Sequence, residues 1–583
     1  MSEKEWTIMI YMAGDNNLAV DMAYAMEQIK GVAEVGAESP NLFVYYDGNS
    51  PAIPTLYCDF SQPQKPRYVR SYKVPHKLYA VPNKENENAA DIRSILNFVD
   101  WCVNRVEVEN AGEISFGRRA QKYALIFSGH SLGFQDIGLF KDETSGKSLK
   151  MSDFYVALQA LTNTKKDLEQ YAKTNKLEGE ACDIVTTELL GQKLDILGFD
   201  SCVMGMLEVG YQFNNVAKTM IASEGSVPSA GWTYAKILGC LAREQNRNVD
   251  TREVAALFVK EFVRSQDAYT VGGVSVDMAA WDLSRFSGLA AGFDGLSVAL
   301  LDCFEDKESR IYRQMARVIL QVHWQCQSYM YDQNVDLGDF CELLDRECGL
   351  VAKELGGEDA EILKTVQEQC RVVLKELHEA VILSGFSGGS YQYSNGVSVF
   401  FPWSREGYEV SRKNYESLWF AKEAKRKQLS WMGFLKKYLY DVSLRKFEEP
   451  VDNALAGSKY KYPSGVRFDD RAESILSGDG ASRTKIAGQE GSKIAGQEGS
   501  KIAGQEGSKI AGQEGSKIAG QEGSKIAGQE GSKIAGQEGS KMAGGGGASG
   551  FFSSLRLFKN IESRWDVSGF TKKPDETETA DAN

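Results

Sequence analysis

The sequence has few or none of the features that mark several large classes of protein. Its 583 residues include four histidines, and its ten cysteines form no C-x-x-C pair and no zinc-ligand spacing. No apolar run reaches the roughly 18 residues of a membrane span, and the amino terminus lacks a basic region followed by an apolar one. We therefore expect reduced, mostly buried thiols, no transmembrane segment, no signal peptide and a cytoplasmic location.

The charge balance argues against one class of partner. The formal net charge is −13 at pH 7, and an acidic surface repels the phosphates of nucleic acids while it favours basic substrates. A hydrophobic content of 42% over 583 residues is enough for one large core or two. We therefore expect a globular protein over most of the length, with no nucleic acid as partner.

One cysteine closely follows an expected strand. Residues 194–199 are rich in Leu, Ile and Phe and predict a buried strand, and Cys202 comes three residues later. The apolar spacing over 203–210 predicts a helix that begins beside this cysteine. Chemistry in open α/β sheets lies outside the carboxyl ends of the strands, and a helix amino terminus favours a thiolate over a thiol. Cys202 is therefore a candidate nucleophile, although most cysteines are small buried hydrophobes.

A histidine is placed in the same way. Residues 123–127 predict a second buried strand, which breaks into the segment 128–133 that contains His130. The other three histidines lie in poorer contexts, one beside a proline and two within expected helices: His76, His323 and His378. A cysteine and a histidine at the ends of neighbouring strands form a dyad in which the imidazole accepts the thiol proton and later protonates the leaving amine.

The same segment also fits a second enzyme class. Residues 129–133 match G-x-S-x-G, the nucleophile elbow of α/β-hydrolases, in which Ser131 would be the nucleophile of a serine esterase. The elbow requires a helix directly after the serine, whereas 134–140 predict a loop or short strand, and no His-Gly-Gly segment precedes it. The esterase is one alternative, and a non-catalytic interaction protein on a peptidase fold is the other.

Strand and helix patterns alternate over the first half of the chain. Strands are expected near 6–12, 41–46, 123–127, 195–199 and 218–222, and helices near 18–34, 88–104, 150–161 and 203–213. This alternation predicts an α/β catalytic domain over 1–245, with a largely parallel sheet flanked by helices. In the region 246–445 we expect mainly helix up to 385, a strand at 391–402 that completes the core, and a helix at 428–440.

The end of the chain has a different composition. Residues 446–483 predict a linker, and 484–547 hold eight copies of the octapeptide SKIAGQEG, of which the first begins with Thr484 and the last is degenerate. Two glycines and one isoleucine in eight residues cannot bury a core, so a disordered tether is expected. Within 548–583, the segment 551–565 is amphipathic as a helix and is expected to dock on the catalytic domain, with a membrane surface or a partner protein as the second reading. The acidic end is expected to be disordered.

Five stretches stand in a characteristic order: WTIMIYMAGDNNL at 6–18, the segment around His130, DSC at 200–202 with Met204 and Glu208, ASE at 222–224 followed by Pro228, Gly231, Trp232 and Tyr234, and NGVSVFFP at 395–402. Together they resemble the clostripain-like (C11) cysteine peptidases, relatives of the caspases, over about the first 440 residues. The resemblance implies a caspase-like fold with His130 as general base and acid and Cys202 as nucleophile. It also implies an oxyanion hole made by the backbone N–H groups of Cys202 and of Ser131, where the family usually has glycine. The acid two residues before the cysteine, Asp200, is implied to line a pocket for an Arg or Lys side chain.

Asp200 allows two readings from the residues alone. Positions i and i+2 of an extended segment project to the same side, so its carboxylate and the Cys202 thiol can face one cleft, where the carboxylate would pair with a basic side chain. An aspartate just before a helix is also a common N-cap. No cofactor is expected, and Asp15, Asn16 and Asn17 could ligate calcium but equally fit a turn and a helix cap.

The sequence therefore predicts a cysteine endopeptidase that cleaves protein or peptide substrates after Arg or Lys. Caspase-like enzymes are often activated by a cut between the histidine and the cysteine. Lysines lie in the loop 141–150 and in the polar stretch 162–192 of this region, although most lysines simply lie on solvated surface. Regulation by proteolytic processing is thus expected.

Overall fold

The computed structural model describes residues 4–442 apart from short gaps, at 36–39, 50–53, 63–65, 75–76, 80–85, 108–113, 117–118, 137, 175–187, 242–248, 267–274, 330–332 and 423–430. The chain divides into two compact units, Met1–Ile382 with Phe386–Tyr462, and Leu383–Gly385 with Pro463–Asn583. Nearly all described residues belong to the first unit. The expected linker, repeats and amphipathic segment, 446–583, lie outside the described residues.

One large sheet forms the centre of the first unit. In the described residues its strands follow the order β13-β10-β9-β8-β7-β1-β2-β3-β4. The five middle strands are parallel, and β3, β4 and β10 are antiparallel to their neighbours. The bounds are β1 (Lys4–Gly14), β2 (Asn41–Gly48), β3 (Leu56–Asp59), β4 (Arg67–Arg70), β7 (Ala120–Ser128), β8 (Leu194–Asp200), β9 (Ala217–Ala222), β10 (Val276–Asp282) and β13 (Val381–Ser387).

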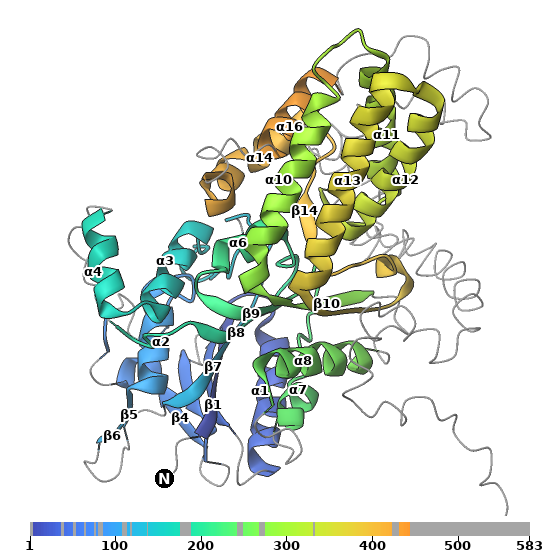
Figure 1. Cartoon of the computed structure of the whole chain (residues 1–583). Coiled ribbons are helices and arrows are strands. Elements are labelled where there is room, and N and C mark those ends of the chain that lie inside the picture. Colours follow the sequence, from blue (N-terminus) through green and yellow to red (C-terminus); the bar gives the residue numbers. More distant parts are fainter. Residues whose placement is uncertain are drawn as a thin grey trace, which may run out of the picture. The chain divides into compact units, whose positions relative to one another are not determined.

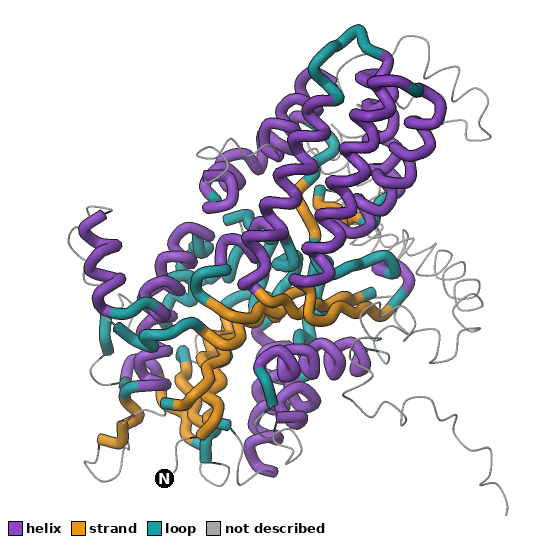
Figure 2. The backbone as a smooth tube through the Cα atoms, viewed as in Figure 1, coloured by secondary structure: helices purple, strands orange, loops and turns teal. Residues whose placement is uncertain are grey.

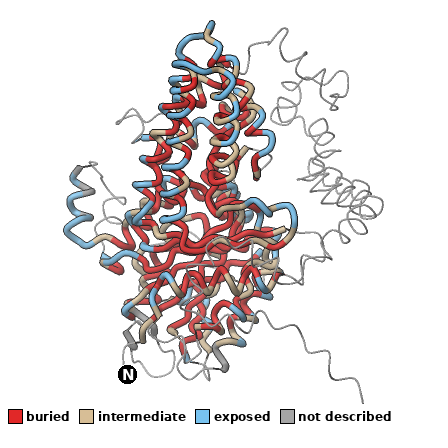
Figure 3. The backbone as a smooth tube through the Cα atoms, turned by 45° about the vertical axis from the view of Figure 1, so that its right-hand side comes forward, coloured by how far each residue is buried: buried red, intermediate tan, exposed pale blue. Residues whose placement is uncertain are grey.

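Helices cover both faces of this sheet, which explains why its middle strands are continuous apolar runs rather than alternating ones. Figure 1 shows α1 (Ala19–Val35), α7 (Tyr234–Leu241) and α8 (Thr251–Ser265) on one face, and α2 (Ile92–Val103) and α3 (Met151–Thr162) on the other. Every residue of β8 is buried, and the burial view shows mostly buried backbone at the centre of the unit (Figure 3). The sheet is therefore a rigid core whose strand ends can hold side chains in fixed positions.

The later helices pack together beyond β10 (Figure 2). They include α10 (Phe286–Asp302), α11 (Arg310–Gln325), α12 (Leu337–Leu355), α13 (Gly357–Ala380), α14 (Arg405–Ser417) and α16 (Trp431–Lys437), the last continued by a π-helical turn, Tyr438–Val442. A small sheet, β11 (Ser328–Tyr329), β12 (Asn334–Asp336) and β14 (Ser398–Phe400), lies among them. The remaining elements are α4 (Lys165–Thr174), α6 (Leu207–Phe213) and the hairpin of β5 (Arg105–Glu107) and β6 (Ile114–Phe116).

The α/β fold with a largely parallel sheet is confirmed, as are the five expected strands and the helices α1, α2 and α3. The region expected to be helical up to 385 contains two further strands of the central sheet, β10 and β13. The first was missed because Met and Ala favour helix locally, and pairing with β9 overrides that preference. The strand expected at 391–402 is only β14, and it pairs with β12 instead of extending the central sheet. The domain boundary at 245/246 stays a prediction.

No helix among the described residues is long and apolar enough to cross a membrane.

Candidate active site

The register of two neighbouring strands brings the candidate residues to one edge of the sheet. β7 and β8 are parallel, and Ser128 is paired with Asp200 at their carboxyl ends. Beyond this pair, the N–H of Gly129 donates to the carbonyl of Asp200 (3.3 Å), which keeps the two chains side by side past the strands. His130 and Cys202 each follow two residues after the paired positions, so the expected placement at adjacent strand ends is found.

Cys202 differs from the other described cysteines in its exposure. Nine cysteines are free thiols, and all of them except Cys202 are buried. Its Sγ lies 3.4 Å from the N–H of Val227 and 3.7 Å from the Val227 carbonyl oxygen, which can accept the thiol proton. This thiol is therefore the described one best placed to meet a substrate.

The helix after Cys202 begins later than expected. α6 starts at Leu207 with Met206 as N-cap, so four residues lie between Cys202 and the first helical residue. The field of a helix terminus falls off within its first turn, so α6 cannot stabilise a Cys202 thiolate in the way we predicted. Burial is the main cause that raises the pKa of Cys202 above the ordinary thiol value, and the Val227 N–H lowers it only in part. The resting sulfur is thus a thiol.

The backbone after the cysteine is strained and tightly held. Val203 has φ of 60°, which is unusual for a β-branched residue and costs of the order of 1–3 kcal/mol. Its N–H donates to the Gly225 carbonyl (2.9 Å), and the N–H of Gly205 donates to the Ser223 carbonyl (2.7 Å). A Cβ on Gly205 would lie 2.5 Å from the backbone nitrogen of Glu224, so only glycine lets these two segments approach. The loop over 223–227 therefore fixes the position of Cys202.

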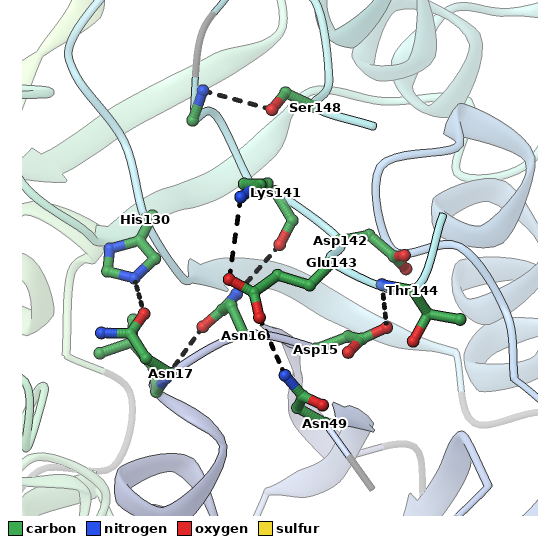
Figure 4. Close-up of polar contacts among 12 residues, drawn as sticks. Asp15, Asn16, Asn17, Asn49, His130, Lys141, Asp142, Glu143, Thr144 and Ser148 are labelled. Carbon is green, nitrogen blue, oxygen red and sulfur yellow. Dashed lines mark hydrogen bonds and ion pairs between the residues drawn. The ribbon is translucent and has the colours of Figure 1, made fainter. Parts of the chain in front are cut away.

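His130 is partly buried, and its ring is held from the side of β1. The Nε2 atom lies 2.6 Å from Oδ1 of Asn17, in the turn that follows β1 (Figure 4). Burial lowers the pKa of His130 below its usual range, nearby Lys141 lowers it further, and Glu143 opposes both. The imidazole is therefore neutral near pH 7, which is the form that can accept a proton from the thiol.

These two shifts predict a specific pH dependence. A lowered His130 pKa means that kcat/KM for an uncharged substrate falls only as the pH drops below the ordinary histidine range near 6.5. A raised Cys202 pKa means that the rate of alkylation by iodoacetamide, followed by mass spectrometry, still rises above pH 8.5. A plateau of alkylation already reached near pH 5, as in enzymes with a resting thiolate–imidazolium pair, would contradict this picture.

Ser131 is not built as a nucleophile. Its hydroxyl donates to the backbone carbonyl of Cys202 (2.5 Å), which ties together the two loops that carry the candidate dyad. Residues 131–150, where described, contain turns and no helix, and α3 starts only at Met151. The geometry of an elbow is therefore missing. In the described part of the chain, no carbonyl accepts a hydrogen bond from the backbone N–H of Ser131 or of Cys202.

Asp200 is buried and bonded to three donors. Its carboxylate accepts hydrogen bonds from the Ser128 hydroxyl (3.0 Å), the Tyr234 hydroxyl (2.9 Å) and the Trp232 N–H (2.9 Å). It is no helix cap, because α6 begins after Met206. Burial raises the pKa of Asp200 to about 6 despite these donors. The carboxylate would thus be ionised at neutral pH and lose its charge in mild acid.

Sequence reasoning missed the acid that supports the loop over 223–227. The Asp277 carboxylate accepts hydrogen bonds from the N–H groups of Glu224 (2.7 Å) and Gly225 (2.8 Å), and burial raises its pKa to about 7. The Glu224 side chain in turn accepts from the Gly396 N–H (2.8 Å). Glu224 stood in one of the noted stretches, whereas Asp277 lies in β10, which was read as helix. Only tertiary structure connects the two.

The described residues contain no group of three or more His, Cys, Asp or Glu side chains that could hold a metal ion. Asp15 accepts from the N–H of Thr144 (3.1 Å), and Asn16 bonds to the carbonyls of Ala13 (2.9 Å) and Lys141 (3.0 Å) (Figure 4). These two side chains therefore make hydrogen bonds typical of a turn.

The remaining histidines have other surroundings. His323 is buried, and its ring stacks on those of Phe401 (4.0 Å between ring centroids) and Trp403 (3.8 Å). Burial lowers the pKa of His323 to about 3. His378 is exposed on α13, and His76 lies outside the described residues. Among the described histidines, only His130 follows a strand that pairs with the strand before Cys202.

A mostly parallel α/β sheet with a cysteine and a histidine at adjacent strand ends is the arrangement of a cysteine endopeptidase. Residues 10–437 match the clostripain family, Peptidase C11. Clostripain of Hathewaya histolytica is 24% identical over 449 residues, which cover 68% of this chain and 74% of that protein. This chain belongs to the clostripain family and is a cysteine endopeptidase.

Solved structures of C11 proteases are also similar to this chain. An inactive zymogen from Parabacteroides distasonis is 17% identical with a TM-score of 0.45, and the match covers 73% of this chain and 99% of that one. A secreted protease from Bacteroides thetaiotaomicron, in complex with an irreversible peptide inhibitor, is 16% identical with a TM-score of 0.44 and covers 73% and 99%.

Proposed function

We propose that this endopeptidase cleaves after arginine or lysine, with Cys202 as nucleophile, His130 as general base and acid, and Asp200 as the carboxylate that recognises the basic side chain. The observation that carries the proposal is the register of β7 on β8. Ser128 is paired with Asp200, and His130 and Cys202 each follow two residues after this pair. The exposure of Cys202 and the neutral state of His130 support the same roles.

The chemistry follows the order of an acyl transfer. The His130 imidazole takes the Cys202 proton as the sulfur attacks the scissile carbonyl carbon, and a C–S bond forms. The oxyanion accepts hydrogen bonds from the backbone N–H groups of Ser131 and Cys202, to which the described residues give no other acceptor. The C–N bond then breaks, and the imidazolium gives its proton to the leaving amine. Water, deprotonated by His130, then attacks the acyl carbon. The C–S bond breaks, the acid is released, and the imidazolium returns its proton to the Cys202 sulfur.

Asp200 supplies the selectivity in this proposal. It lies two residues before the nucleophile, and burial strengthens its attraction for a cation because water screens the charge less. A panel of otherwise identical amide substrates with Arg, Lys, Gln or norleucine at the cleavage position tests this. We expect kcat/KM for the two basic substrates to exceed that for the neutral ones by at least about 100-fold. Equal rates for all four would refute the basic specificity without refuting the enzyme class.

We further propose that processing and the carboxyl-terminal segment regulate the enzyme. Lys147 is exposed in a turn between His130 and Cys202, and each octapeptide repeat carries a lysine outside the described residues. Intact-mass analysis should show cuts after such lysines in the wild-type protein and none in Cys202→Ala.

If the segment 551–565 docks on the catalytic domain, a chain that ends at Ser482 should differ in turnover from a full-length chain with Gln in place of the repeat lysines. Added 551–565 peptide should reverse the difference, and identical turnover would make the repeats a spacer.

A further inference from the structure

The turn after β1 reaches the candidate active site from the side opposite Cys202's strand. β1 lies beside β7 in parallel register, with Met12 paired to Ser128, so the chain segments after both strands leave the sheet at the same edge. Asn17 comes five residues after Met12, and its side chain is exposed. It nevertheless makes the 2.6 Å contact between Oδ1 and Nε2 of His130 (Figure 4).

The preceding two residues hold this turn in place. Asn16 donates to the carbonyl of Lys141 (3.0 Å) and accepts from the N–H of Leu18 (3.0 Å), and the carbonyl of Asp15 accepts from the N–H of Glu143 (2.8 Å). The turn is thus tied to residues 141–144, which continue from the His130 loop. Because the backbone around Asn17 is held in place, only the rotamer of its side chain has to be ordered for the contact with His130.

An amide oxygen accepts hydrogen bonds and cannot donate them. Because Oδ1 of Asn17 faces Nε2, the neutral imidazole must carry its proton on Nε2, and the lone pair lies on Nδ1, which points away from Asn17 (Figure 4). Nδ1 is therefore the base. The same hydrogen bond persists when Nδ1 takes the thiol proton, because the imidazolium still donates from Nε2.

We propose that Asn17 is a positioning residue that selects the reactive tautomer of His130, an inference that rests on the proposed roles of His130 and Cys202. The charged groups that act on the ring are Glu143 and Lys141, which oppose one another. Asn17 orients the ring without adding charge, which leaves the imidazole neutral near pH 7. A carboxylate in the same place would orient the ring equally but would favour its protonated form.

Two near-isosteric variants separate these contributions. Asn17→Leu removes the acceptor, and we expect kcat for an Arg amide substrate to fall about 10- to 100-fold with little change in KM. Asn17→Asp keeps the acceptor and adds charge, so it should retain most of kcat while the acidic limb of the kcat/KM profile moves to higher pH. The matched control is Asn49→Leu, because Asn49 is exposed in the same cluster and bonds to Glu143 instead of the ring (Figure 4).

A spectroscopic readout separates this inference from the proposed function. With four histidines in the chain, long-range ¹⁵N–¹H spectra can be assigned by comparison with His130→Ala. We expect the Nε2-protonated tautomer in the wild type and a mixture of tautomers in Asn17→Leu. Unchanged kcat and tautomer in Asn17→Leu, while Cys202→Ala is inactive, would overturn the role of Asn17 alone. Full activity of His130→Ala would instead overturn the proposed dyad.

Discussion

Cys202→Ala is expected to lower kcat for arginine and lysine amides by about 10⁴- to 10⁶-fold, because loss of a covalent nucleophile removes the whole acyl-transfer route. His130→Ala should cost nearly as much, since Cys202 is then a thiol with no base to take its proton. The two losses should not add in the double variant, because the two groups act in one step. Steady-state kinetics with fluorogenic amides, together with thermal unfolding of each variant, measure this.

Two serines provide matched controls. Ser131→Ala removes one hydrogen bond to the Cys202 carbonyl, and the typical net value of such a bond, about 0.5–1.5 kcal/mol, limits the loss to roughly tenfold. Ser201→Ala, directly beside the nucleophile, should be nearly neutral, because its buried hydroxyl has no partner among the described residues. If Ser131→Ala abolished activity while Cys202→Ala did not, the nucleophile would be Ser131.

The sequence was most informative where one strand determines the position of a side chain. The apolar runs before His130 and Cys202 predicted β7 and β8, and a parallel sheet then brings their carboxyl ends together without further information. The uninterrupted burial of β8 and of the last six residues of β7 produces a strong local signal, and the carboxyl ends of both strands are correspondingly well defined.

Contacts between distant segments carried no such signal. The apolar pattern over 203–210 has the helical period, but Val203 adopts a left-handed conformation and the helix begins only at Leu207. That choice is imposed by hydrogen bonds from the loop over 223–227, which Asp277 holds from β10. The expected activation of the thiol by a helix dipole was wrong for the same reason. The residues after Cys202 form hydrogen bonds with the loop over 223–227 instead of beginning a helix.

The contact between Asn17 and His130 also could not be predicted from the sequence. Three successive polar residues after β1 predicted a turn or a cation site, and two of them do build the turn. Which side chain would face His130 depends on the pairing of β1 with β7 and on the bond from Asn16 to the Lys141 carbonyl. Neither can be read from spacing along the chain.

The specificity of the enzyme should depend on the charge of one buried carboxylate. Asp200→Asn is expected to weaken transition-state binding of Arg and Lys substrates by about 2–5 kcal/mol, which is roughly 30- to 5,000-fold in kcat/KM, because a cation would enter a buried site without its counter-charge. Substrates with Gln or norleucine should lose far less. The matched control is Tyr234→Phe, which removes one hydrogen bond to Asp200 and keeps the charge.

The pH dependence makes this test sharper. Because the pKa of Asp200 is raised to about 6, the carboxylate gains a proton and loses its charge as the pH falls through 6. As Asp200 loses its charge, kcat/KM for basic substrates should fall, and protonation of His130 should lower it further. For neutral substrates, only the protonation of His130 should lower kcat/KM. The Tyr234 hydroxyl lowers the pKa of Asp200, so Tyr234→Phe should move the extra limb to higher pH, and Asp200→Asn should abolish it. If Asp200→Asn instead slowed basic and neutral substrates equally, with a parallel drop in Tm, the carboxylate would serve only to hold Ser128, Trp232 and Tyr234 in the fold.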